Sequence, residues 1–108
     1  MIEETQAEPS ATPVTSPRVD VLREAAAIIS GDRDTQYGGP EENFTRIAKI
    51  WSVIVGIDFS TEDVAMMMVG LKVARYANHG EFQPDTWRDI AGYAGCGYEV
   101  GYLNSARS

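Results

Sequence analysis

The stretch VAMMMVGLKVARYA, residues 64–77, is apolar on every side except at Lys72 and Arg75. A helix that is apolar all round is normally buried, so we expect this one to lie inside a helical domain. Lys72 and Arg75 are three residues apart and share one face of the helix. Buried cations need partners, because an unpaired charge in an apolar interior is costly. The partners are either carboxylates of the chain, such as Asp85 and Asp89, or phosphates of a ligand.

The composition is that of one small domain. The chain has 108 residues, of which 44% are hydrophobic, and this is enough for a single core. The longest apolar run, residues 64–71, is far shorter than the roughly 20 residues that cross a bilayer. The lone cysteine, Cys96, excludes an intramolecular disulfide and a multi-cysteine zinc site. Since no basic segment followed by an apolar one opens the chain, we expect no secretory signal and a reducing cytosol.

The charge balance narrows the class of partner. The chain carries 9 basic and 16 acidic residues, for a net charge of −7. Such a balance argues against binding to a nucleic-acid backbone, which needs a basic stripe. It is compatible with a small anionic ligand held by a few convergent cations.

The chain divides into a tail and a helical domain. Residues 1–16 are rich in Pro, Thr, Ser, Ala and Glu and lack an apolar period, which predicts a disordered tail. In the domain, residues 17–108, no segment shows the strict alternation of apolar and polar residues that is typical of a half-buried strand. Helical spacing instead marks residues 17–30, 40–55, 60–78 and 84–103. We therefore expect an all-α fold, a small domain resembling a four-helix bundle.

Start and stop signals support these helices. Pro17 and Pro40 suit first helical positions. Gly56 is placed to end the second helix. Ser60 and Asp63 form a sequence that resembles a capping box, which predicts the start of the third helix.

The last predicted helix is unusually rich in glycine. Each glycine costs about 1 kcal/mol relative to alanine in a helix interior. That cost is tolerable only where another backbone comes close, and tight packing inside one bundle is one explanation. Because two nearly all-apolar helices leave so short a chain little exterior to cover them, we favour a homo-oligomer.

Asp85, Asp89 and Tyr93 follow one another in four-residue steps and so share one side of the last helix. If the last two helices form an antiparallel hairpin, Asp89 approaches Arg75 or Lys72. An interhelical salt bridge would then explain the cations without any ligand, and such pairs specify register more reliably than they stabilise.

The loop GDRDTQYGGP, residues 31–40, offers Arg33 and Tyr37 between glycines. It is suited to clamp a base by stacking and a phosphate by bidentate contact. The alternative explanation is that Asp32 and Asp34 only form turns and that Arg33 forms an ion pair within the loop. The complete set of candidate ligand-binding residues is Arg33, Tyr37, Asn43, Lys72, Arg75, Asp85, Asp89 and Tyr93.

Several acids lie at predicted helix starts or on polar seams. Each acid taken alone is explained by the helix dipole, which favours a negative charge at the start of a helix. As a cluster beside two cations they can hold Mg²⁺ and a phosphate together, since Mg²⁺ takes oxygen ligands. The candidate metal ligands are Glu42, Glu62, Asp63 and Asp89. No catalytic residue is assigned.

Three strings closely resemble a family of small uncharacterised proteins of bacteriophages and prophages, especially those of actinobacteria. They are GDRDTQYGGPEENFTRIAKIWS, STEDVAMMMVGLKVARYANH and DTWRDIAGYAG, and the resemblance covers about residues 20–103. The matching blocks are Asp32-Arg33 with Tyr37-Gly38, Glu42-Asn43-Phe44, Trp51, Glu62-Asp63-Val64-Ala65, Lys72 with Arg75, and Asp85 through Tyr93. The resemblance implies the cytosol of a bacterial host.

More distantly, the chain resembles the all-helical MazG-type nucleotide pyrophosphohydrolases. That resemblance implies cleavage of a nucleoside triphosphate to a monophosphate and pyrophosphate, with magnesium held by acids on a helical bundle. The Glu-x-x-Glu and Glu-x-x-Asp pairs of those enzymes are missing, however. Glu42 is followed three residues on by Thr45, Glu62 by Ala65, and Asp89 by Gly92. The likeness therefore supports a nucleotide-sized polar pocket more than it supports hydrolysis.

These features predict a phage accessory protein that binds a nucleotide or a nucleotide-derived ligand in a polar pocket of a helical oligomer. Two forms of this hypothesis are a MazG-like pyrophosphohydrolase and a non-catalytic protein that sequesters a nucleotide signal of host defence. The alternative from another class is a purely structural or interaction protein, in which the charged network only sets the helix register.

Overall fold

The computed structural model describes residues 16–30 and 39–107, and these residues form helices without any strand. The all-α prediction is confirmed. The predicted tail, except for Ser16, and loop residues 31–38 lie outside the described residues. The helices are α1 (Pro17–Ile28), α3 (Pro40–Val55), α4 (Thr61–Asn78) and α5 (Pro84–Arg107).

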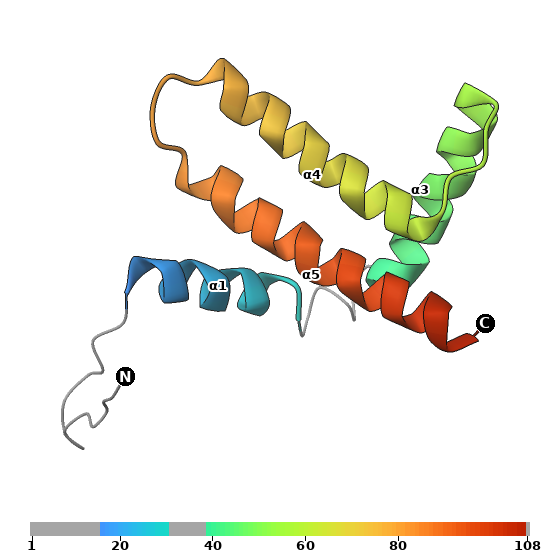
Figure 1. Cartoon of the computed structure of the whole chain (residues 1–108), viewed down its shortest axis with the longest axis horizontal. Coiled ribbons are helices and arrows are strands. Elements are labelled where there is room, and N and C mark those ends of the chain that lie inside the picture. Colours follow the sequence, from blue (N-terminus) through green and yellow to red (C-terminus); the bar gives the residue numbers. More distant parts are fainter. Residues whose placement is uncertain (1–15, 31–38, 108) are drawn as a thin grey trace.

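The helices are arranged around α5, which contacts each of the other three (Figure 1). α4 and α5 run antiparallel side by side, as expected for a hairpin, and make the most extensive contact. α3 crosses them near the start of α4, and α1 packs along the opposite side of α5. The 24-residue α5 is therefore the element that holds the fold together.

The predicted helix signals act as expected at the start of α4. The backbone N–H of Asp63 donates to Ser60 Oγ at 3.0 Å, and the backbone N–H of Ser60 donates to Asp63 Oδ2 at 2.9 Å. This reciprocal pair is a complete capping box. At the end of α3, Gly56 takes a φ of 86°, the left-handed conformation that glycine adopts without strain.

Two helix ends differ from the predictions. α1 ends at Ile28, two residues before the predicted Ser30. α5 continues to Arg107, four residues beyond the predicted Leu103. The added turn is held by contacts to other helices: Asn104 Nδ2 donates to Thr61 Oγ1 at 3.1 Å, and Arg107 forms an ion pair with Glu41.

The core lies where α3, α4 and α5 meet. Phe44 and Ala48 come from α3, Val64 and Ala65 from α4, and Val100 from α5. Half-buried apolar side chains surround them, and Cys96, predicted as a small core residue, packs among these.

Glycines of α5 allow this close packing. A methyl group at Gly97 would lie 3.0 Å from Ala65 Cβ, which is tighter than side chains normally approach. Methyl groups at Gly92 and Gly95 would lie 3.3 and 3.1 Å from side-chain atoms of Ile29. These contacts lie within one chain, so packing inside the domain explains these glycines without a second copy.

The prediction that residues 64–77 are buried on every side is wrong for a single chain. Val64 and Ala65 are buried, whereas the side chains of Met66, Val73 and Tyr76 are about half exposed or more. The cause is that α5 covers one side of α4 and α3 crosses only its N-terminal half, so the described helices leave the opposite side uncovered (Figure 1). The expected homo-oligomer is not tested by one chain and stays a prediction.

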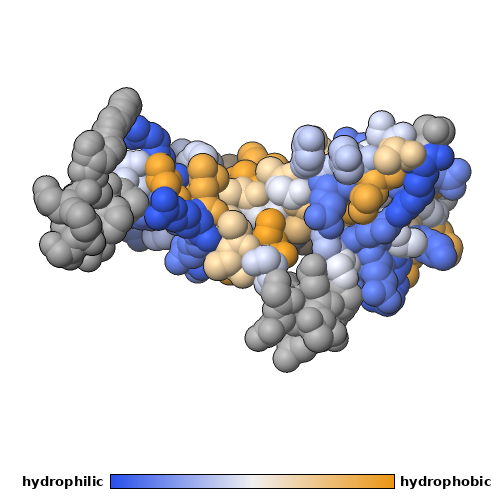
Figure 2. Space-filling view, turned by 90° about the horizontal axis from the view of Figure 1, so that it is seen from below, coloured by the Kyte–Doolittle hydropathy of each residue, from blue (hydrophilic) through white to orange (hydrophobic). Residues whose placement is uncertain are grey.

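The face formed by α1 and α5 also carries apolar surface. Hydrophobic residues gather in the middle of this face, with hydrophilic residues toward both ends (Figure 2). On α1 the side chains of Leu22 and Ile28 are exposed, and only Ala25 is buried. α1 therefore packs on α5 through a narrow contact and leaves a hollow beside it.

Candidate functional site

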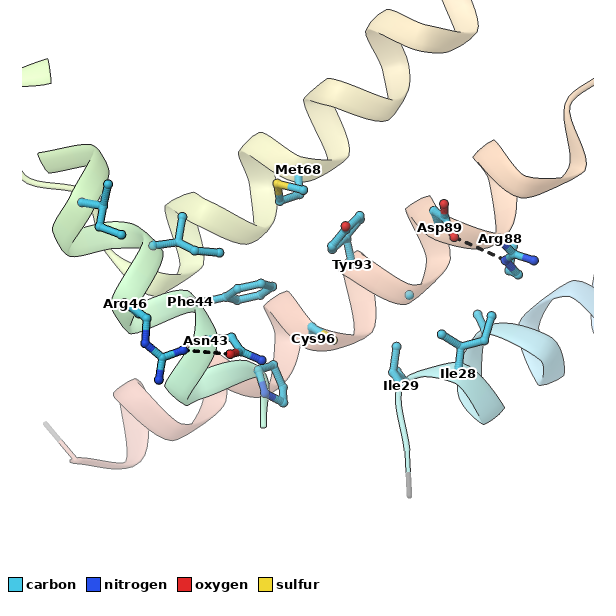
Figure 3. Close-up of a pocket in the computed structure, with 15 residues that line it drawn as sticks. Ile28, Ile29, Asn43, Phe44, Arg46, Met68, Arg88, Asp89, Tyr93 and Cys96 are labelled. Carbon is cyan, nitrogen blue, oxygen red and sulfur yellow. Dashed lines mark hydrogen bonds and ion pairs between the residues drawn. The ribbon is translucent and has the colours of Figure 1, made fainter. Parts of the chain in front are cut away.

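A cavity of about 590 Å³ lies between α1, α3 and α5, with Met68 of α4 in its wall (Figure 3). Pockets for small molecules typically fall between roughly 300 and 1,000 Å³. Apolar side chains form most of the lining: Phe44 and Ile47 of α3, Ile29 directly after α1, and Cys96 of α5. The cavity is thus of the size and character of a ligand pocket.

Polar side chains lie at two separate ends of this pocket (Figure 3). Asn43 and Arg46 project from α3 at one end, and Arg88 and Asp89 project from α5 at the other. The phenol of Tyr93 lies between the two ends. A ligand in the pocket would therefore meet polar groups at both ends and apolar surface in the middle.

Asp89 is the centre of a charged cluster that joins α4 to α5. Lys72 Nζ lies 2.9 Å from Asp89 Oδ2, and Arg88 Nε donates to Asp89 Oδ1 at 3.3 Å. The guanidinium of Arg88 also contacts Asp85 at 3.3 Å. Of the two predicted cations, Lys72 is therefore the one that pairs with Asp89, and its side chain is 15% exposed.

The environment of Asp89 keeps its carboxylate ionised. Burial alone would raise the pKa of this group, because it disfavours the charged form. The hydrogen bonds and positive charges of Lys72 and Arg88 outweigh that effect, so the pKa of Asp89 is lowered below its ordinary value. At neutral pH this end of the pocket presents a carboxylate bound by two cations.

Arg46, at the other end, is held much more loosely. Its Nη1 donates to Asn43 Oδ1 at 3.2 Å, and its Nη2 lies 3.6 Å from Glu42 Oε2. The Arg46 and Glu42 side chains are 60% and 64% exposed, and exposed pairs one helical turn apart contribute little. The guanidinium can therefore turn to a ligand at small cost.

The structure brings together some of the predicted ligand-binding residues and separates others. Asn43, Asp89 and Tyr93 line the pocket, and Lys72 reaches it through its contact with Asp89. Asp85 is 79% exposed and supports Arg88.

The other predicted residues are not part of this arrangement. Arg75 is exposed and forms no ion pair with any residue of segments 16–30 and 39–107. Arg33 and Tyr37 lie outside the described residues. The lining residues on either side of that segment are Ile29 and Pro40.

The four candidate magnesium ligands do not meet at one point in the described chain. Glu42 faces Arg46, the carboxylate of Glu62 lies against Gly101, and Asp63 caps α4. Asp89 is bound by Lys72 and Arg88. Within the described segments no three His, Cys, Asp or Glu side chains are grouped so that they could hold a metal ion. The magnesium site stays a prediction without support from these side chains.

Two arginines of the pocket were missed by the sequence reasoning. Arg88 was recognisable, because it lies next to Asp89 and one turn after Asp85 in a helix. No sequence pattern marked Arg46. An arginine three residues after Asn43 on a polar helix face is typical of a solvent-exposed side chain. The wall contributed by α1 depends on tertiary packing alone.

Comparison with known proteins identifies a family. Residues 20–101 match the model of a protein family described as "Domain of unknown function (DUF6378)". The Gene 55 protein of Mycobacterium phage L5 is 47% identical over 78 residues, 71% of this chain and 49% of that protein. The Gene 55 protein of Mycobacterium phage D29 is 42% identical over 76 residues, 70% of this chain and 50% of that protein.

The chain therefore spans about half the length of these curated relatives. No solved structure matches the chain. The family and the two phage relatives give no support to the more distant MazG-type resemblance. A helix long and apolar enough to cross a membrane is not found in the described part of the chain. The mycobacteriophage relatives and the match over most of the chain together show that it belongs to the DUF6378 family, whose function is unknown and whose members include actinobacteriophage proteins.

Proposed function

We propose that this chain is a phage accessory protein that binds a nucleotide or a nucleotide-derived ligand in the pocket between α1, α3 and α5. The observation that carries the proposal is one cavity of about 590 Å³ with an apolar, partly aromatic middle and an arginine at each end. A nucleotide has the matching division into a flat base and a charged phosphate.

The middle of the pocket is suited to the base. The rings of Phe44 and Tyr93 come from different helices and both border the cavity. Aromatic faces pack well against flat rings and add to the burial of apolar area. The ionised Asp89, at the end of the pocket away from Arg46, can accept hydrogen bonds from the edge of a base.

Arg46 is the better candidate for the phosphate. Its planar guanidinium can bind phosphate oxygens in pairs, and its existing contacts are exposed and long. Arg88 is already bound to both Asp85 and Asp89, so its role is to orient Asp89.

We propose that the protein binds the nucleotide without cleaving it, and hydrolysis of the nucleotide is the alternative. The acid pairs of MazG-type enzymes are missing from the sequence, and the described candidate ligands lie apart. A phage protein that only binds would suit the sequestration of a nucleotide signal of host defence. A pyrophosphohydrolase would instead consume its ligand in the presence of Mg²⁺.

Titration calorimetry of the full chain with a panel of linear and cyclic nucleotides, with and without Mg²⁺, tests the proposal. We expect at least one nucleotide to bind, and chromatography after release to recover it unchanged. Recovery of a monophosphate and pyrophosphate would establish the enzymatic form, and no binding by any nucleotide would overturn the proposal.

Two variants of α3 make the test specific to the pocket. Arg46→Gln removes the proposed phosphate contact, and we expect affinity to fall by about tenfold, as for a charge-assisted hydrogen bond. Lys49→Gln removes the same charge from the same helix at an exposed position that does not line the pocket. Equal losses in the two variants would mean that binding reflects overall charge only.

The cluster around Asp89 supports an architectural role as well. The Lys72 ammonium and the Asp89 carboxylate satisfy each other within the chain. This favours Lys72 as a residue that fixes the register of α4 on α5, whether or not a ligand binds nearby.

A further inference from the structure

We infer that Asp89 makes the pocket selective for guanine among the nucleotide bases. The inference rests on the proposed function, because it names the base that the bound nucleotide carries. Its structural ground is a carboxylate that is fixed at the end of the pocket away from Arg46 (Figure 3). An ionised carboxylate accepts hydrogen bonds and donates none.

The carboxylate of Asp89 keeps hydrogen-bonding capacity for a ligand. Lys72 Nζ lies 2.9 Å from Oδ2, and Arg88 Nε donates to Oδ1 at 3.3 Å, so the two cations use different oxygens. A carboxylate oxygen has two lone pairs, and each oxygen can therefore accept one more hydrogen bond. The side chain is 27% exposed and borders the cavity. Asp89 can thus accept two parallel hydrogen bonds from two adjacent donors of a ligand.

The two cations hold this carboxylate in position before a ligand arrives. Lys72 belongs to α4 and Arg88 to α5, so the group is bound from two helices. The side chains of both cations are largely buried. A binding group that is already ordered loses less conformational freedom when the ligand binds, and this favours specific recognition.

This end of the pocket suits the neutral edge of a base better than a phosphate or a cation. The cluster around Asp89 contains two cations and two carboxylates, so its formal charge is zero. A phosphate placed here would meet the carboxylate that lines the cavity, and like charges in contact are costly. A cationic ligand would have to compete with the two cations that already bind Asp89.

Guanine is the common base whose edge matches two acceptors. Its Watson–Crick edge places a ring N–H and an exocyclic amino group side by side, and both are donors. Adenine and cytosine each place a ring-nitrogen acceptor beside the amino group, and uracil has a carbonyl on either side of its one N–H. These three bases would therefore turn at least one acceptor toward the carboxylate. A site built to hydrogen-bond a group of its ligand discriminates strongly against ligands that lack that group.

The other polar side chains of the described lining do not reproduce this pattern. Asp89 is the only acid among the described residues that line the pocket. Asn43 and Arg46 lie at the opposite end, and Tyr93 contributes a single hydroxyl group. The choice of base therefore depends on Asp89, whereas Arg46 contacts the phosphate that all nucleotides share.

Titration calorimetry of the wild-type full chain with matched guanosine, inosine and adenosine nucleotides tests the inference. Inosine is guanosine without the exocyclic amino group, so it offers the carboxylate one donor in place of two. We expect the guanosine nucleotide to bind at least about tenfold more tightly than the inosine nucleotide, and adenosine to bind more weakly still. Monophosphate, triphosphate and cyclic monophosphate series distinguish linear from cyclic ligands, and the same order is expected in each series that binds.

The outcomes separate this inference from the proposed function. Equal affinities for guanosine and inosine, or tighter binding of adenosine, would overturn the guanine preference and leave nucleotide binding intact. No binding of any nucleotide would overturn both.

A change of preference in one variant tests the residue itself. Asp89→Asn replaces one acceptor oxygen by an amide donor. Xanthosine carries a carbonyl where guanosine carries the amino group, so we expect its nucleotide to bind this variant more tightly than the wild type. The guanosine nucleotide should bind the variant at least about tenfold more weakly. Equal losses for both nucleotides would show a merely structural role of Asp89 and overturn the inference.

Glu99→Gln is the matched control. It removes the same charge from an exposed position of α5 that is not among the lining residues, and it should leave the order of the bases unchanged. A changed order in this control would mean that the preference reflects overall charge, which would also overturn the inference. Circular dichroism checks that the Asp89→Asn variant is folded, and the wild-type series decides the question if it is not.

Discussion

Lys72 Nζ on α4 lies 2.9 Å from Asp89 Oδ2 on α5, and this contact answers the question raised by two cations in an apolar helix. For Lys72 the partner is a carboxylate of the same chain. The pair also links the hairpin to the pocket, because Asp89 lines the cavity while Lys72 lies behind it.

The first prediction concerns the stability of this pair. Asp89→Leu leaves the largely buried Lys72 ammonium without its partner, and we expect a loss of about 2 kcal/mol in the free energy of unfolding. Lys72→Met with Asp89→Leu should recover most of it, since two apolar side chains replace the pair. Urea denaturation measures both values. As a control, Glu42→Gln removes an exposed pair and should change stability by less than about 0.5 kcal/mol. Equal stability of the single and double variants would contradict the prediction.

The second prediction is a pH dependence with a definite sign. The folded pKa of Asp89 is depressed, so its pairing stabilises the fold fully above the unfolded pKa, which is about 4 for an aspartate. That contribution is lost as the pH falls through the lower, folded pKa. The stability difference between wild type and Asp89→Asn, measured by urea unfolding, should be constant above about pH 5 and shrink below about pH 4. A difference that grows on acidification would contradict the sign.

The third prediction contrasts two glycines of α5. Gly97→Ala would place a methyl group 3.0 Å from Ala65 Cβ, in the core, and we expect destabilisation despite the better helix propensity. At Gly101 the neighbouring atoms belong to the end of the flexible Glu62 side chain, 3.2 Å away, which can move. Gly101→Ala should therefore stabilise the chain by up to about 1 kcal/mol. Thermal and urea unfolding would show opposite signs, and the same sign in both would contradict the packing described.

The fourth prediction uses Cys96 as a reporter of the pocket. It is the single cysteine of the chain and lines the cavity in a half-buried position. We expect a saturating nucleotide to slow its modification by a thiol reagent several-fold, because the ligand would cover the sulfur. The Arg46→Gln variant provides the control. In this variant a higher nucleotide concentration should be needed to protect the Cys96 thiol from modification. An unchanged rate at saturation would place the ligand elsewhere.

Local signals made the helices predictable. Prolines at positions 17 and 40, the Ser60–Asp63 capping box and Gly56 each act through neighbouring backbone atoms, so their effects can be read without knowledge of the fold. The burial of α4 could not be read in this way. Residues 64–77 are apolar on most sides, but burial depends on which of those sides the other helices reach, and Met66 and Val73 are exposed.

The site was predictable only where one helix carries the information. Asp89 and Tyr93 share a face of α5, and their joint presence in the pocket follows from that spacing. The choice of Lys72 over Arg75 as partner of Asp89 depends on the crossing geometry of two helices. Arg46 and Ile29 reach the pocket because α3 and α1 both pack on α5, and no local pattern in the sequence reports this.

The central position of α5 has a consequence for synthesis of the protein. α1 is made before α3 and α4, yet its main packing partner is α5, which follows both of them in the sequence. The pocket and the core also need residues of α5. The nascent chain therefore cannot complete this core and pocket until α5 has been made.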